Sequence, residues 1–406
     1  MRLEKISRRR DPSFLEAVGP VYGSHYLRKA GCAITVPRPM RRPAISKSPV
    51  VVKIGTSSLA RPDLGIDREA IRRVVANVES AWSAGHPTVL VTSGAIAAGL
   101  PVMGLSARPA DIPGLQAAAA VGQSRLMTMY TEEFETLGRQ VGQVLITREV
   151  VARRDHYLNA RAALVRMLGL GVVPVVNEND TIVVDEVRFG DNDRLAAIVS
   201  HLVGAGMLVL LTDTPGIYSG DPWISENAEL LSAVRHTDQI LDDLRVSSSR
   251  GRFGSGGVAT KVAAARMAAW SGIPTVIASA SEEQVVARSI SGDEIGTWID
   301  PRESGLSARK LWIAFGSPSE GHIIVDEGAA RALTDSGKSL LPVGVTAVDG
   351  AFLGGAAVEV MHGADLIAKG LVSMSSEDID RVRGEHTSVA GGEIIHRDDL
   401  VVLAST

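Results

Sequence analysis

The chain has 406 residues, of which 45% are hydrophobic and 22% charged, and a formal net charge of −4 at pH 7. This length predicts about two or three domains and leaves ample residues for a hydrophobic core. A single cysteine, Cys32, excludes an intrachain disulfide or a cysteine-based zinc cluster, so we expect a reducing, cytoplasmic location. No apolar run approaches the roughly 20 residues of a membrane span, which excludes an integral membrane protein.

Charge is unevenly distributed along the chain. Residues 1–48 contain 11 Lys and Arg against 3 Asp and Glu, a net +8, whereas residues 320–406 contain 6 against 14, a net −8. Residues 1–48 show no sustained apolar period, so we expect a flexible basic extension without a role in chemistry. Met40, just before the first predicted strand, indicates a start site assigned too far upstream, and a transit peptide is the alternative.

The first predicted strand, residues 50–54, consists of apolar residues interrupted by Lys53 and is followed by Gly55 and three hydroxyl residues. Such a run is typical of a strand buried on both faces of a parallel sheet. Near the carboxyl end of this strand, Lys53 and the backbone N–H groups of the Gly55 turn suit an anionic ligand, above all a phosphate. A lysine whose charged end reaches solvent at a sheet edge is the alternative.

Strands and helices alternate through most of the chain. Further buried strands are predicted at residues 88–91, 141–147, 172–176 and 207–211. Helices are predicted at about residues 71–82, 115–137, 155–168, 195–202 and 262–270. This alternation predicts an α/β fold, a three-layer α/β/α sandwich with a mostly parallel central sheet.

After about residue 320 the pattern changes to short strands with frequent glycines. These strands are predicted at residues 322–325, 356–360, 394–395 and 400–403. They indicate a small β-rich module. We therefore predict an extension at 1–48, a first domain at 49–305, a linker at 306–319 and a second domain at 320–406.

Polar side chains follow several predicted strands, at the end where open α/β sheets bind ligands. Ser93 follows the second strand, and the segment Asn177 to Asp180 follows a later one as a polar cage suited to a zwitterion. An ordinary helix cap at Ser93 and simple turn chemistry at 177–180 are the alternatives. The segment 190–193 crowds two carboxylates and an amide at a helix start, where a cap needs only one such residue.

Residues 251–261 (GRFGSGGVATK) are rich in glycine and end on Lys261, just inside a predicted helix. They have neither the Walker A order nor the GxGxxG order. The Gly-Lys-Ser at 337–339 does not complete a Walker motif either, because Ala332 stands where the first glycine belongs. A nucleotide site in this chain therefore follows a different plan.

Together these segments resemble the amino acid kinase family, in particular its bacterial members that phosphorylate glutamate and carry a C-terminal PUA domain. The resemblance covers about residues 49–404 and is carried, in family order, by VVKIGTSSL, VTSGAIAAG, AAVGQSRL, NARAAL, VPVVNEND, FGDND, LLTDTPGIY, GSGGVATK, VDEGA, SLLP and HRDD. Ser255 and Val258 depart from the Thr and Met usual in the family. They bear on nucleotide affinity rather than on the reaction.

The resemblance implies ATP-dependent phosphorylation of the γ-carboxylate of L-glutamate, the first step of proline biosynthesis, with Mg²⁺ and with feedback inhibition by proline. It assigns the phosphates to Lys53 and Lys261, and we expect Asp191 or Asp193 to hold these lysines apart, the choice between the two being open, as is metal ligation by either. The residues assigned to ATP are Lys53, Thr212, Asp213, Ser255, Gly256, Gly257, Val258, Ala259, Thr260 and Lys261. Those assigned to glutamate are Ser93, Asn177, Asp180 and Asn192.

Electrostatics gives these glutamate residues separate expected roles. Asp180 is expected to meet the substrate ammonium, and Asn192 and Ser93 to reach the α-carboxylate. We expect a homo-oligomer and, because an acyl phosphate is labile, a glutamyl phosphate reductase as partner. The alternatives are amino acid kinases acting on aspartate, acetylglutamate, carbamate or UMP, and an RNA-binding protein; the net −8 of residues 320–406 opposes nucleic acid and favours a regulatory or assembly role for that domain.

Overall fold

The computed structural model describes residues 42–61, 65–147, 150, 154–182, 191–220, 222, 227–235, 238, 255–303, 305–317, 319–385 and 392–403. All of them belong to one compact unit, Arg41–Thr406. The sequence predicts a short hairpin of residues 182–184 against 187–189, which lies outside the described residues apart from Ile182, as do residues 251–254 of the glycine-rich segment.

The larger sheet has eight strands in the order β3-β4-β2-β1-β5-β7-β8-β6. Its strands are β1 (Val50–Ile54), β2 (Thr88–Thr92), β3 (Val141–Ile146), β4 (Val173–Glu178), β5 (Met207–Thr212), β6 (Ala233–Arg235), β7 (Thr275–Ser279) and β8 (Thr297–Asp300). Neighbouring strands are parallel except β7 and β8, which are antiparallel. The prediction of a mostly parallel central sheet is confirmed, and β6 to β8 are additions that the sequence patterns did not indicate.

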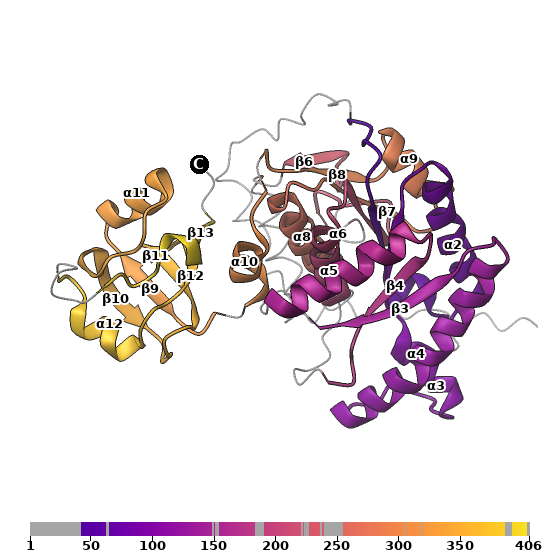
Figure 1. Ribbon diagram of the computed structural model, residues 1–406, viewed down its shortest axis with the longest axis horizontal. Coiled ribbons are helices and arrows are strands. Elements are labelled where there is room, and N and C mark those ends of the chain that lie inside the picture. The colour runs from indigo at the N-terminus through magenta and orange to yellow at the C-terminus, as the bar shows by residue number, and fades with distance from the viewer. Residues whose placement is uncertain are drawn as a thin grey trace, which may run out of the picture. The chain divides into compact units, whose positions relative to one another are not determined.

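Helices cover both faces of this sheet (Figure 1). One face carries α2 (Arg68–Ser83), α4 (Ile112–Glu135) and α9 (Val285–Ser291), and the other α5 (Arg154–Gly169), α6 (Asp191–Val203) and α8 (Ser255–Trp270). Within β1, Val51 packs into one core while Val50 and Val52 pack into the other, as the twofold period of a strand requires. The three-layer sandwich is therefore confirmed.

None of the described helices has the length and apolar composition needed to cross a membrane.

The position of β1 determines where a ligand can bind. β1 lies between β2 and β5, and the chain builds the sheet first on the β2 side and then on the β5 side. In parallel α/β sheets the crevice at such a change of direction lies outside the carboxyl ends of the strands. The short helices α1 (Thr56–Leu59) and α3 (Ala95–Val102) begin at this edge, directly after β1 and β2.

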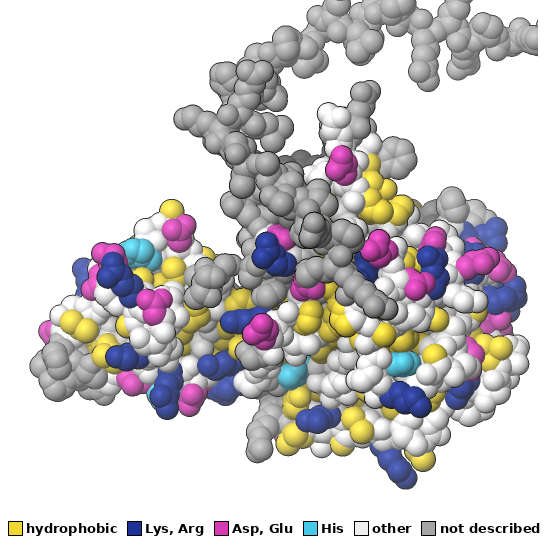
Figure 2. Space-filling view, turned by 90° about the horizontal axis from the view of Figure 1, so that it is seen from above, with side chains coloured by type: hydrophobic (Ala, Val, Ile, Leu, Met, Phe, Trp, Pro, Cys, Tyr) yellow, Lys and Arg dark blue, Asp and Glu magenta, His cyan; other side chains and the backbone are white. Residues whose placement is uncertain are grey.

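The C-terminal domain contains a five-stranded sheet in the order β10-β9-β11-β12-β13. Its elements are β9 (His322–Val325), α11 (Glu327–Ser336), β10 (Val345–Asp349), β11 (Ala357–His362), β12 (Asp365–Leu371), α12 (Ser376–Val382) and β13 (Leu400–Val402), with 3₁₀ turns at Pro342–Gly344 and Arg397–Asp399. The strand predicted at 394–395 is only an isolated bridge between Ile395 and Leu340. Figure 2 shows acidic and basic side chains mixed on the visible face of this domain.

The structure describes part of each of the two segments predicted to flank the first domain. The predicted linker contains α10 (Ala308–Leu311) and a π-helix (Trp312–Gly316), and Arg309 Nε lies 2.5 Å from Asp399 Oδ1. In the predicted extension, Arg42 is only 5% exposed and donates hydrogen bonds to four backbone carbonyls, those of Ser232, Asp293, Ile295 and Gly296. Arg42 is therefore packed against the first domain, because a buried guanidinium needs such acceptors.

Candidate active site

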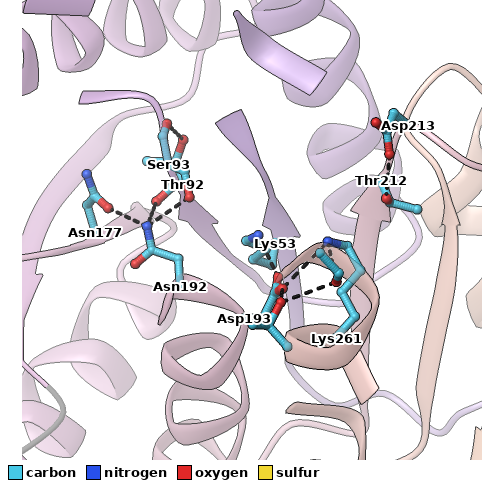
Figure 3. A network of polar contacts seen from close by, with 11 residues as sticks. Lys53, Thr92, Ser93, Asn177, Asn192, Asp193, Thr212, Asp213 and Lys261 are labelled. Carbon is cyan, nitrogen blue, oxygen red and sulfur yellow. Dashed lines mark hydrogen bonds and ion pairs between the residues drawn. The ribbon is translucent and has the colours of Figure 1, made fainter. Parts of the chain in front are cut away.

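Two lysines and one aspartate form a buried ion cluster at the carboxyl edge of the larger sheet (Figure 3). Lys53 Nζ, from the end of β1, lies 2.5 Å from Asp193 Oδ1, and Lys261 Nζ lies 3.6 Å from Asp193 Oδ2. The side chain of Lys53 is 4% exposed and that of Asp193 is fully buried. We call Lys53, Asp193 and Lys261 the ion cluster; it carries one net positive charge when all three groups are ionised.

The charges of the ion cluster shift one another's protonation. Burial by itself raises the pKa of Asp193, but the charges of Lys53 and Lys261 and hydrogen bonds from Lys53 and Thr260 outweigh it, so this pKa lies below its ordinary value. Burial lowers the pKa of Lys53; Asp193 opposes this shift and the charge of Lys261 adds to it. The carboxylate is therefore firmly ionised at neutral pH, and Lys53 is a cation that gives up its proton more easily than an exposed lysine.

Local structure explains how three distant segments meet in the ion cluster. Asp193 lies in the first turn of α6, where the helix dipole favours a carboxylate. Lys261 lies in the second turn of α8, where it also donates to Gly257 O at 3.2 Å, and Thr260 Oγ1 donates to Asp193 Oδ2 at 2.8 Å. Of the two aspartates predicted to hold the lysines, Asp193 forms ion pairs with both, and the side chain of Asp191 lies outside the described residues.

Beside the ion cluster lies a neutral network built on Asn192 (Figure 3). Asn192 Nδ2 lies within hydrogen-bond distance of three acceptors, among which its two hydrogens are shared: Thr92 O at 3.0 Å, Ser93 Oγ at 2.8 Å and Asn177 Oδ1 at 2.9 Å. Asn177 Nδ2 in turn donates to Gln123 Oε1 at 2.8 Å. We call Ser93, Gln123, Asn177 and Asn192 the amide network. It joins the ends of β2 and β4 to the starts of α3 and α6.

Backbone groups determine which end of each amide points where. Thr92 O can only accept, so the atom of Asn192 that meets it is Nδ2, and Glu178 N can only donate, so the atom of Asn177 that meets it is Oδ1. Asn192 Oδ1 is thereby left buried without a hydrogen-bond partner among the described residues. An unpartnered acceptor suits an ammonium group, which differs from the expectation that Asn192 reads a carboxylate. Ser93 accepts from Asn192 and keeps its own hydrogen for donation.

Of the residues expected to bind ATP, Lys53 lies on β1, Thr212 ends β5 and is followed by Asp213, and residues 255–261 lie on α8. Residues 255–261, expected as a glycine-rich loop, are instead the first two turns of α8. The first N–H groups of a helix have no partner within the helix, so they can bind a phosphate just as those of a glycine-rich loop can. Thr212 follows Leu211, the β5 partner of Ile54, and its Oγ1 donates to the exposed Asp213 carboxylate at 3.0 Å. Among the described residues, no hydrogen bond joins this pair to the ion cluster.

Two side chains at this edge were not singled out from the sequence. Gln123 belongs to the AAVGQSRL segment, where only the resemblance drew attention to it. Arg108 lies between α3 and α4; burial lowers its pKa, and the charge of Asp180 opposes that shift. Arg108 therefore lies within electrostatic reach of Asp180. A single arginine in a connecting segment carries no periodic or motif signal, so only the fold could reveal this pair.

A resident metal site is not formed by the described side chains, where no group of three or more His, Cys, Asp or Glu is arranged to hold a metal ion. Both oxygens of Asp193 already meet cationic or hydroxyl groups. Magnesium bound with a nucleotide commonly keeps water and phosphate oxygens as ligands and takes only one or two carboxylates from the protein. The site is compatible with Mg²⁺ that enters with ATP.

Comparison with known proteins identifies a family for each of the two domains. The model of the amino acid kinase family matches residues 48–279, and that of the PUA domain matches residues 321–390. A glutamate 5-kinase from Pelobacter propionicus is 44% identical over 374 residues, covering 90% of this chain and all of the relative, and one from Gloeobacter violaceus is 46% identical over 370 residues, covering 87% and 99%. Among solved structures, a UMP kinase from Bacillus anthracis matches with a TM-score of 0.44 at 14% identity, covering 62% of this chain and 96% of its own.

The chain therefore belongs to the amino acid kinase family and, within it, to the glutamate 5-kinases that carry a C-terminal PUA domain.

Proposed function

We propose that this protein transfers the γ-phosphoryl group of ATP to the γ-carboxylate of L-glutamate, with the ion cluster at the point of transfer. The observation that carries the proposal is the convergence of Lys53 and Lys261 on the buried carboxylate of Asp193, beside a neutral amide network. The first feature suits phosphate and the second suits the polar groups of an amino acid. The relatives named glutamate 5-kinase support the choice of substrate.

The chemistry needs cations more than it needs a base. A side-chain carboxylate is already ionised at neutral pH, so the nucleophile requires no deprotonation. The main barrier is the approach of this anion to the negatively charged γ-phosphoryl group, and fixed positive charges lower it. Lys53 and Lys261 supply these charges, and Asp193 keeps the two ammonium groups apart and oriented. Mg²⁺, when bound, neutralises further phosphate charge.

We assign the two substrates to the two sides of the ion cluster. The start of α8, with Gly256 to Lys261, and Thr212 with Asp213 after β5 bind the nucleotide, since free N–H groups at a helix start attract phosphate. Asp180 and Asn192 Oδ1 receive the ammonium of glutamate, and the Ser93 hydroxyl donates to its α-carboxylate. Asn177 holds Asn192 in place through the 2.9 Å hydrogen bond.

The direct test is turnover of ATP with glutamate, with the acyl phosphate trapped by hydroxylamine. We expect glutamyl hydroxamate with glutamate, and little or none with aspartate, acetylglutamate or carbamate in its place. No hydroxamate from glutamate would overturn the proposed reaction. An equal yield from another acid would overturn the proposed substrate while leaving the phosphoryl transfer.

We further propose that proline inhibits the enzyme in competition with glutamate. Proline has the same α-carboxylate and a charged amino group but no side-chain carboxylate to phosphorylate, so it can occupy the amino acid half of the site without reacting. The measurement is the inhibition by proline at increasing glutamate concentration. Inhibition that saturating glutamate relieves supports the proposal, whereas inhibition that persists places proline at a separate site.

For the C-terminal domain we propose a role in regulation or assembly, since its net charge of −8 opposes nucleic acid binding. A variant ending at Gly305 is expected to keep glutamate phosphorylation while its oligomeric mass or proline sensitivity changes. Tight RNA binding by the full chain at physiological salt would contradict this role.

Because the acyl phosphate product is labile, we also propose that a reductase of acyl phosphates takes it up. We further propose that the enzyme is a homo-oligomer.

A further inference from the structure

Two glycines bring helix α4 against the start of α3. A Cβ at Gly122 would lie 1.8 Å from Ala95 O, and a Cβ at Gly99 would lie 2.0 Å from Ala118 O. No side chain fits in either place, so the two backbones touch at Gly99 and Gly122. Gln123 follows Gly122 directly, and this contact places it beside Ala95, two residues after Ser93 of the amide network.

The amide of Gln123 has one end that is used and one that is not. Its side chain is 92% buried, since only 8% is exposed, and its Oε1 accepts the hydrogen bond from Asn177 Nδ2. The direction is determined, because Glu178 N already identifies the other end of Asn177 as Oδ1. Gln123 Nε2 is then a buried donor without a hydrogen-bond partner among the residues that the structure describes.

Gln123 Nε2 and Asn192 Oδ1 are complementary to an amino acid. Both atoms are buried and unpartnered, one is a donor and the other an acceptor, and Asn177 bridges the two side chains. Buried polar atoms in folded proteins nearly always have a hydrogen-bond partner. We therefore expect Gln123 Nε2 to donate to a ligand acceptor and Asn192 Oδ1 to accept from a ligand donor. An α-amino acid carries an ammonium and a carboxylate on one carbon, which supplies both within a short distance.

We propose that Gln123 is a specificity-determining residue that donates a hydrogen bond from Nε2 to the α-carboxylate of the amino acid substrate. The proposal rests on the proposed function and deepens it. Through Oε1, Gln123 also orients Asn177, so that Asn192 presents Oδ1 to the ammonium. A purely structural role explains the Oε1 contact but leaves the buried Nε2 donor unexplained.

Two substitutions separate substrate contact from support of Asn177. Gln123→Glu keeps an oxygen for Asn177 and replaces the Nε2 donor with an acceptor, and Gln123→Met removes the donor without adding charge. Gln143→Glu, at an exposed glutamine on β3, is the matched control. The measurements are dissociation constants by calorimetry for L-glutamate and for L-isoglutamine, which keeps the γ-carboxylate but has a carboxamide instead of the α-carboxylate, together with the KM for ATP.

We expect Gln123→Glu to weaken glutamate by about 10- to 100-fold, the usual cost of losing a hydrogen bond to a charged group. Its preference should shift towards L-isoglutamine, whose amide N–H can donate to the new carboxylate. Gln123→Met should weaken glutamate about tenfold or more and L-isoglutamine less. The KM for ATP should stay within about twofold, and Gln143→Glu should change nothing.

The inference would be overturned if the ratio of the two dissociation constants stays unchanged in both variants, that is, if both ligands are weakened equally or not at all. If Gln123→Glu does not fold, the ratio in Gln123→Met decides. A wild-type enzyme that makes no hydroxamate from glutamate would defeat the proposed function itself. An active wild type with an unchanged ratio in the variants would defeat only the role of Gln123.

Discussion

The ion cluster and the amide network lie next to each other at one edge of the sheet, yet they are built on opposite principles. Lys53, Asp193 and Lys261 are charged and compensate one another, whereas every side chain of the amide network is neutral. The residues 192 and 193, adjacent in α6, belong to different halves. One turn of helix thus joins a charged region to a neutral region held by hydrogen bonds.

The difference indicates how binding and rate are divided. Fixed charges act most strongly where charge develops during phosphoryl transfer, so the ion cluster should govern kcat. Hydrogen bonds to groups that do not react are equally strong before and during transfer, so the amide network should govern KM. Substitutions in the two halves should therefore have separable kinetic signatures, and a variant that mixes them would break the division.

The largest effect is expected from Asp193→Asn. It leaves two lysines side by side without their carboxylate, so we expect kcat to fall by about 10³-fold or more and the free energy of unfolding to fall by about 3–5 kcal/mol. Rapid-mix kinetics and denaturant unfolding measure the two quantities. Asp365→Asn, at an exposed aspartate, is the control. A variant with near-native kcat would remove Asp193 from the mechanism.

Lys261→Ala, and likewise Lys53→Ala, should lower kcat by about 10²- to 10³-fold, because each removes one preorganised cation from the transfer site. The KM for glutamate should move far less. Lys338→Ala, an exposed lysine of the C-terminal domain, should leave both constants unchanged. A rise in glutamate KM that exceeds the loss in kcat would place these lysines in recognition and break the division between the halves.

Asp180→Asn tests the other half. Removing the charge partner of the substrate ammonium should weaken glutamate and proline together by about a hundredfold, while kcat at saturation changes little. The measurements are glutamate KM and the proline inhibition constant. Resistance to proline with an unchanged glutamate KM would mean that proline makes contacts of its own. Arg108→Ala should act in the opposite direction, because it frees Asp180 from a competing cation.

The ion cluster should also make kcat depend on pH. Because burial lowers the pKa of Lys53, kcat should decline on the alkaline side at a pH below 10.5, the ordinary value for lysine, as Lys53 loses its proton. Asp193 opposes that shift, so the residual activity of Asp193→Asn should decline at a still lower pH. The pH profile of kcat at saturating substrates measures this. A profile that does not move between wild type and Asp193→Asn would contradict the coupling.

The smallest effect is expected from Thr260→Val. It removes the 2.8 Å hydrogen bond to Asp193 Oδ2 but leaves every charge of the ion cluster in place, so kcat should fall only about three- to tenfold. Thr260→Ser keeps the hydroxyl and should behave as wild type. A loss as large as that of Lys261→Ala would mean that Thr260 contacts the nucleotide directly rather than acting through Asp193.

The sequence by itself determined the sandwich and most of its elements. Apolar runs such as residues 50–54 and 207–211 are read locally, because a strand buried on both faces must be apolar along its whole length. The same local reading placed Lys53, Ser93 and Asn177 at strand ends, where the fold class puts ligands. The short strands β6 and β8 were not predicted, because three or four residues are too few to show a periodic pattern.

Only the tertiary structure decided which side chains meet and which way they face. Asp193, at the start of α6, meets Lys53 of β1 and Lys261 of α8 because the fold brings these three segments together. Gln123 enters the site because Gly99 and Gly122 let two backbones touch, and Arg42 is buried because carbonyls from residues 232–296 surround it. These contacts join residues tens to hundreds of positions apart, and their distances follow from packing, which no local pattern contains.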